Sequence, residues 1–251
     1  GTAAIAVFAV AIQLSVLYMS FSTSISGVFL PKVTAMVASQ SDQKEIADLF
    51  IRTGRIQYIV MAFILSGFVV FGRPFIRLWA GAGYEDAYGI SLLFFISLTI
   101  PMIQNLGITI LQARNRMKFR SLLYLVIAFV SLYFQFVLAK QYGGLGCAIA
   151  ISAALLIGQG LIMNVYYHRR QGLDLILFWK EIGRMSVIPF ILGVSAFWLL
   201  RDAVWENWFQ LGLGIGIYTL VYLPLFFHYS MNQTERNLFL TPFRKIRSLA
   251  Y

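Results

Sequence analysis

Charged side chains are scarce in this chain. They make up 12% of its 251 residues, and its 10 acidic residues are outnumbered by 20 lysine and arginine residues, which gives a net charge of +10. Soluble domains carry about a quarter charged residues. The mean hydropathy here is +0.76, so an ordinary soluble domain is excluded. The basic residues lie in short loops and are not interleaved with a row of aromatic residues, which argues against a nucleic-acid partner.

Cysteine and histidine are nearly absent. Cys147 is the one cysteine, so the chain forms no internal disulfide. His168 and His228 are far apart in sequence, and Glu85 and Asp86 are the one adjacent pair of carboxylates. A membrane-embedded enzyme would need more such groups. We therefore predict no catalytic residue, no metal site, no cofactor and no enzymatic activity.

Long apolar runs are abundant instead. A bilayer core about 30 Å thick is crossed by about 20 helical residues, and the runs are continuous, whereas a β-barrel would alternate. The sequence therefore predicts an all-α fold, a polytopic transmembrane helical bundle that forms a single membrane domain over residues 1–251. Seven spans are expected, at about 3–30, 56–71, 88–111, 121–139, 145–167, 185–200 and 209–229.

The basic residues indicate an orientation. All of them except Arg73, Arg77, Lys140 and Arg201 fall in loops that follow odd-numbered spans. By the positive-inside rule these loops are cytoplasmic, which places the N-terminus outside and the C-terminus inside. Three segments on this side are amphipathic, at 42–50, 175–184 and 239–246, and such helices usually lie in the headgroup plane. They are read as topological anchors or, alternatively, as gates or partner contacts.

No Asp, Glu, Lys, Arg or His lies in the middle of a span, although proton relays and ion sites usually need one. Uncharged polar residues do occur there. Gln13, Ser20, Ser24 and Gly27 share one face of the first span. Such a stripe either packs against another helix or lines a wet cavity.

Two other spans carry local signals. In the third span Pro101 predicts a kink beside the amides of Gln104 and Asn105, a pattern that favours a cavity. In the last span Gly212 and Gly216 predict a close contact between helices. Gln57 and Asn164 are lone polar residues and are expected to form hydrogen bonds between helices.

Several strings resemble, in their order and spacing, the oligosaccharide flippases of the multidrug/oligosaccharidyl-lipid/polysaccharide exporter superfamily, which are bacterial polysaccharide transporters. They are GTAAIAVF at 1–8, FSTSISGVFLPKV at 21–33, QARNRMKFR at 112–120, YGGLGCAIA at 142–150, NVYYH at 164–168, GLD at 172–174 and FWK at 178–180. The resemblance covers nearly the whole chain. It implies a MATE-like transporter of two helical lobes in the bacterial inner (plasma) membrane, which moves lipid-linked oligosaccharides for O-antigen, capsule or exopolysaccharide assembly.

This chain resembles the last seven spans of such a transporter, which form most of its C-terminal lobe. The expected partners are a lipid-linked oligosaccharide, membrane lipids and the missing N-terminal lobe. The glycan would cross between the lobes, where uncharged polar groups replace its water hydrogen bonds. The residues expected to line this substrate cavity are Gln13, Ser20, Ser24, Gln104 and Asn105. Arg52, Arg55 and Arg114 either attract the pyrophosphate at the cytoplasmic mouth or serve only to set the topology.

Other functions remain open at this point. A drug or peptidoglycan-precursor exporter of the same superfamily fits the same pattern. A seven-span receptor or photosensor fits the topology, but the last span has no lysine for retinal and one cysteine cannot form a receptor disulfide.

Overall fold

The computed structural model of the chain describes residues 2–39 and 41–238. These residues fold into helices without a strand, so the all-α prediction is confirmed. The predicted amphipathic segment 239–246 lies outside the described residues. The helices are α1 Thr2–Ala38, α2 Gln43–Trp79, the 3₁₀ turn η1 Ala82–Tyr84, α3 Ala87–Ile103, α4 Asn105–Ala113, α5 Lys118–Leu155, the π-helical turn η2 Leu156–Ile162, α6 Met163–Gln171, α7 Leu175–Leu200 and α8 Trp208–Tyr229.

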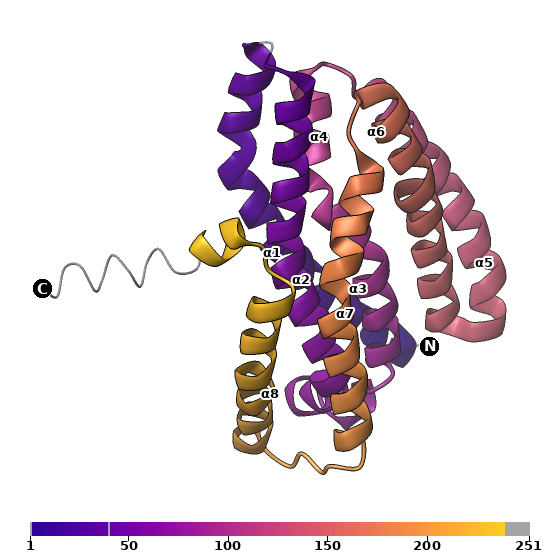
Figure 1. The fold of residues 1–251 in the computed structure, drawn as a ribbon. Coiled ribbons are helices and arrows are strands. Elements are labelled where there is room, and N and C mark those ends of the chain that lie inside the picture. Colours follow the sequence, from indigo (N-terminus) through magenta and orange to yellow (C-terminus); the bar gives the residue numbers. More distant parts are fainter. Residues whose placement is uncertain (1, 40, 239–251) are drawn as a thin grey trace, which may run out of the picture.

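Six helical stretches among the described residues are long and apolar enough to cross a membrane. One of them, Lys118–Gln171, has 54 residues and would be about 80 Å long if it were straight. It reverses direction at Gly143, whose φ of 57° suits glycine, and Figure 1 shows its two arms running antiparallel. When the two arms are counted separately, the described residues contain seven apolar helical segments. Their positions match the seven spans that the sequence predicts.

Helix α2 lies at the centre of the bundle, in contact with α1, α3, α7 and α8 (Figure 1). Its N-terminal part and that of α7 carry the apolar faces predicted at 42–50 and 175–184. These faces pack on each other: Phe50 and Phe178 are both fully buried, and their ring centroids lie 5.1 Å apart. The two segments are continuous with the spans that follow. The expectation that they lie as separate helices in the headgroup plane is therefore wrong, because their apolar faces are covered by protein.

The third predicted span is interrupted near Pro101. Helix α3 ends at Ile103, Gln104 has φ of −107° and ψ of 13°, and α4 begins at Asn105. Ser22 of α1 donates a hydrogen bond of 2.7 Å to the carbonyl of Met102 at this break. The backbone N–H of Gln104 donates to the same carbonyl, so the neighbouring helix adds a second hydrogen bond at the end of α3.

The glycines of the last span behave differently from the prediction. Gly212 and Gly216 are exposed, and a Cβ at either position would meet nothing within 4 Å. Gly214 is the closely packed one, since Trp205 and Phe71 approach it. The expected contact through Gly212 and Gly216 is therefore absent among the described residues.

The two ends of the bundle differ in charge. We call the basic end the one formed by the α1–α2 turn, the C-terminus of α4 and the α6–α7 turn, at the top of Figure 1. The opposite end holds η1, the Gly143 reversal and the α7–α8 loop. Of the basic residues in the described part of the chain, only Arg73, Arg77, Lys140 and Arg201 belong to the opposite end. Many large apolar side chains of α5, α7 and α8 are exposed, as on a surface that faces lipid.

Candidate functional site: a polar helix face and a basic pocket

Helix α1 presents a polar stripe to the outside of the bundle. Gln13, Ser20 and Ser24 are all exposed. Ser20 donates to the carbonyl of Leu17 at 2.6 Å, and Ser24 donates to the carbonyl of Ser20 at 2.8 Å. No hydrogen bond to the amide of Gln13 is made by the residues that the structure describes. Because an unpaired amide is costly in hydrocarbon, this face is suited to contact water or another protein segment.

The opposite face of α1 is polar as well, but it is buried. Gln57 of α2, which has no exposed surface, donates to the carbonyl of Ser22 at 3.2 Å and to Oγ of Ser26 at 2.5 Å. Tyr18 shares a hydrogen bond of 2.7 Å with Thr99 of α3. These bonds hold α1 to α2 and α3 and fix which of its faces points outward. Gln57 forms the hydrogen bond between helices that the sequence predicts.

Gln104 and Asn105 lie elsewhere in the bundle. Gln104 is buried and donates to Oδ1 of Asn164 at 2.8 Å, and the same oxygen accepts from the indole of Trp179 at 2.7 Å. Asn105 is half-buried. The five residues predicted for one cavity are therefore not brought together: three face outward from α1, whereas Gln104 is bonded to α6.

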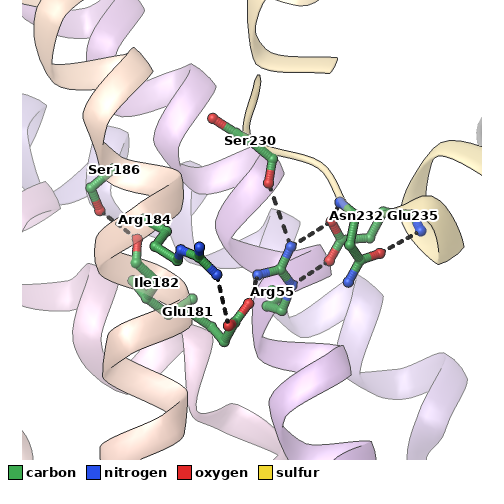
Figure 2. A network of polar contacts seen from close by, with 8 residues as sticks. All are labelled: Arg55, Glu181, Ile182, Arg184, Ser186, Ser230, Asn232 and Glu235. Atoms are coloured by element: carbon green, nitrogen blue, oxygen red, sulfur yellow. Dashed lines mark hydrogen bonds and ion pairs between the residues drawn. The ribbon is translucent and has the colours of Figure 1, made fainter. Parts of the chain in front are cut away.

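Arg55 has a structural role in place of the expected attraction of phosphate. Its guanidinium is buried between α2, α7 and the segment after α8 (Figure 2). Nε and Nη2 donate to the two carboxylate oxygens of Glu235 at 2.6 and 2.8 Å, and Nη1 donates to Glu181 at 2.5 Å. Two carboxylates already compensate this charge, so Arg55 is not free for an anion. Arg52, three residues earlier, is exposed.

Sequence reasoning missed this network, although one signal for it was present. Asn232 accepts a hydrogen bond from the backbone N–H of Glu235, and Glu235 accepts one from the backbone N–H of Asn232, each at 2.9 Å. This reciprocal pair is a capping box. A capping residue such as Asn followed three residues later by Glu is its sequence signature. It holds Glu235, which is only 1% exposed, against Arg55.

Arg114 lies in a pocket of about 560 Å³ at the basic end. Its Nη2 donates to Oε1 of Gln43 at 2.6 Å, and its Nη1 donates to the carbonyl of Gln171 at 3.0 Å. Burial, and to a lesser degree the neighbouring Arg116, lower the pKa of Arg114 below its ordinary value. The polar residues that line the pocket are Ser41, Gln43, Arg114, Arg116, Arg170 and Gln171.

Titratable groups also line a pocket of about 750 Å³ at the opposite end, where Arg73, Glu85 and Asp86 bring charges of both signs together. Glu85 lies 3.8 Å from Arg77 in a solvent-exposed ion pair, and Nδ1 of His168 is 3.2 Å from the carbonyl of Leu173. Within residues 2–39 and 41–238, no group of three or more His, Cys, Asp or Glu side chains is placed to hold a metal ion.

Comparison with known proteins gives no match: no protein-family model, no curated protein and no solved structure is similar to this chain. The geometry of the chain and its residue pattern are therefore the grounds for a functional proposal.

Proposed function

We propose that this membrane protein is one lobe of a transporter that moves lipid-linked oligosaccharides across the bacterial inner membrane by alternating access. The observation that carries the proposal is the outward-facing stripe of Gln13, Ser20 and Ser24 on α1, with an amide that has no partner among the described residues. A second lobe opposite this face would enclose a path lined by uncharged polar groups.

The chemistry of such a path suits a glycan. A sugar headgroup can cross hydrocarbon only if other groups replace its hydrogen bonds to water. Hydroxyl and amide groups do so without a fixed charge. They can also donate and accept, as sugar hydroxyls require. The lipid chain would stay in the bilayer, beside the exposed apolar surface of the bundle.

The proposed orientation places the basic end in the cytoplasm. Its support is the asymmetry of lysine and arginine between the two ends, which sets topology during membrane insertion. The lipid-linked oligosaccharide would then enter the transporter at the basic end and leave it at the opposite end.

The test replaces the polar stripe in the full-length protein. Gln13→Leu, Ser20→Leu and Ser24→Leu together remove the hydrogen-bonding groups but leave exposed side chains that lipid tolerates. We expect the rate of glycan transfer to the periplasm to fall at least about tenfold, with unchanged protein abundance. The measurement is the amount of polymer assembled by cells that lack their own flippase.

The matched control carries leucine at other hydroxyls within the spans. Ser195 of α7 is exposed and Thr219 of α8 is partly exposed, and each donates to a carbonyl of its own helix at 2.7 Å, much as Ser24 does. Ser195→Leu with Thr219→Leu is expected to transport normally. Normal transport by the stripe variant would contradict the proposal, as would an equal loss in the control.

A further inference from the structure

We infer that the pocket around Arg114 is a binding site for the phosphate group of an anionic lipid headgroup. This goes beyond the proposed function, because the site would hold such a lipid whether or not the chain transports a glycan. The pocket lies where three connections meet: the α1–α2 turn, the segment between α4 and α5, and the end of α6. Gln43, Arg114 and Gln171 thus come together from distant parts of the sequence.

Arg114 is held in place without a counter-charge. Its three hydrogen bonds go to neutral oxygens of Gln43 and Gln171. Gln43 is itself fixed, since its Nε2 donates to the carbonyls of Gln171 at 2.7 Å and Gly172 at 3.1 Å. In the described part of the chain no carboxylate forms an ion pair with Arg114. A half-buried guanidinium in a fixed position is therefore ready for an external anion.

Two buried arginines, Arg55 and Arg120, differ from Arg114 because their partners already occupy them. Arg55 is paired with two carboxylates. Arg120 is bonded to the hydroxyls of Tyr167 and Tyr124 and lies 4.8 Å from the centre of the Tyr124 ring. Arg114, by contrast, has only neutral partners and lines a pocket.

The ionisable residues that line the pocket are all basic. Arg114, Arg116 and Arg170 line it, and no acidic residue does. Four acidic residues lie within two positions of a lining residue: Asp42, Glu45, Asp48 and Asp174. Asp42 and Asp174 are helix N-caps. Each of these carboxylates accepts a hydrogen bond from a backbone N–H at the start of a helix, from Lys44 and Leu177 respectively. Three guanidinium groups on one pocket favour an anion there, and the arginine fork matches the oxygens of a phosphate.

The other wall of the pocket points to a lipid as the source of the phosphate. Met36, Val37 and Ile46 are apolar and line the same volume as the arginines. A glycerophospholipid offers both a phosphate and an apolar part next to it, whereas inorganic phosphate offers only the charge. Basic pockets between transmembrane helices on the cytoplasmic side commonly take anionic headgroups.

The test measures lipid binding to the purified full-length protein by native mass spectrometry. Phosphatidylglycerol is titrated against phosphatidylcholine, and inorganic phosphate and pyrophosphate are tested as competitors. We expect phosphatidylglycerol to bind and Arg114→Gln to weaken its binding at least about tenfold, because charge-assisted hydrogen bonds are lost. Arg169→Gln removes an exposed arginine that does not line the pocket and is expected to change the affinity less than about twofold.

Two further variants keep the test decisive. Arg116→Gln with Arg170→Gln alters two exposed side chains, so this protein folds even if Arg114→Gln does not, and it is also expected to bind more weakly. Gln43→Ala keeps every charge but releases Arg114, and it too should weaken binding.

Unchanged affinity in these variants would overturn the site. Binding of pyrophosphate with no preference for phosphatidylglycerol would overturn the lipid assignment. Because no transport is measured, failure here is separate from failure of the transport proposal.

Discussion

Replacing Arg55 with alanine is expected to lower the free energy of unfolding by about 3–5 kcal/mol, because the mutation leaves the buried carboxylate of Glu235 without its counter-charge. Glu235 is 1% exposed, and both of its oxygens accept hydrogen bonds from Arg55. The network joins α2, α7 and the segment after α8 (Figure 2), so its loss should also loosen these elements. Thermal or denaturant-induced unfolding of the purified protein in detergent measures the effect.

Two controls separate the buried network from surface charge. Arg184 lies 3.9 Å from Glu181 and is 75% exposed, so Arg184→Ala should cost less than about 1 kcal/mol. Arg55→Lys keeps the charge but loses the two-pronged contact with Glu235, and an intermediate loss is expected. A stability of Arg55→Ala equal to that of Arg184→Ala would show that the network contributes little.

Gly54→Ala is expected to destabilise the protein by about 1–3 kcal/mol, near the upper end of that range, because the added methyl group has nowhere to go. A Cβ at this position of α2 would lie 2.6 Å from the carbonyl oxygen of Ile103 and would also collide with the ring of Phe178. The ring can shift, whereas the oxygen belongs to the backbone at the α3–α4 break. Accommodation requires α2 to move away from both neighbours.

The matched control lies in the same helix. Gly67 is also in the interior of α2, and a Cβ there would meet nothing within 4 Å. Gly67→Ala should therefore stabilise the protein by about 0.5–1 kcal/mol through its helix propensity. Opposite signs at the two glycines, measured by the same unfolding experiment, are the expected result. A loss of stability at both positions, or at neither, would be inconsistent with the packing of α2 described above.

The sequence predicts the helices well because each span must be apolar, and hydropathy along the sequence measures this property. The split of the longest helical stretch is an example: the polar dip at Lys140 and Gln141, followed by two glycines, marks the reversal at Gly143. Helix ends are predicted less well. The amphipathic segments 42–50 and 175–184 have the sequence pattern of surface helices. Only the contact between the rings of Phe50 and Phe178 shows that the two segments face each other.

Polar residues are harder to interpret because the sequence does not say which helix face is covered. The stripe of Gln13, Ser20 and Ser24 and the buried set of Ser22 and Ser26 alternate along one helix. Periodicity separates the two faces, but only the contact with Gln57 identifies the buried one. In the same way, Arg55 resembles any juxtamembrane arginine until Glu181 and Glu235 are seen beside it. Both carboxylates lie more than a hundred residues further along the chain.

Cysteine labelling in sealed cells tests the membrane topology on which this account depends. In a Cys147→Ser background, Lys118→Cys places an exposed thiol at the basic end, and Asp202→Cys places one at the opposite end. A membrane-impermeant maleimide is predicted to label Asp202→Cys in intact cells and Lys118→Cys only after permeabilisation. Labelling of Lys118→Cys in sealed cells, with Asp202→Cys protected, would contradict the proposed topology.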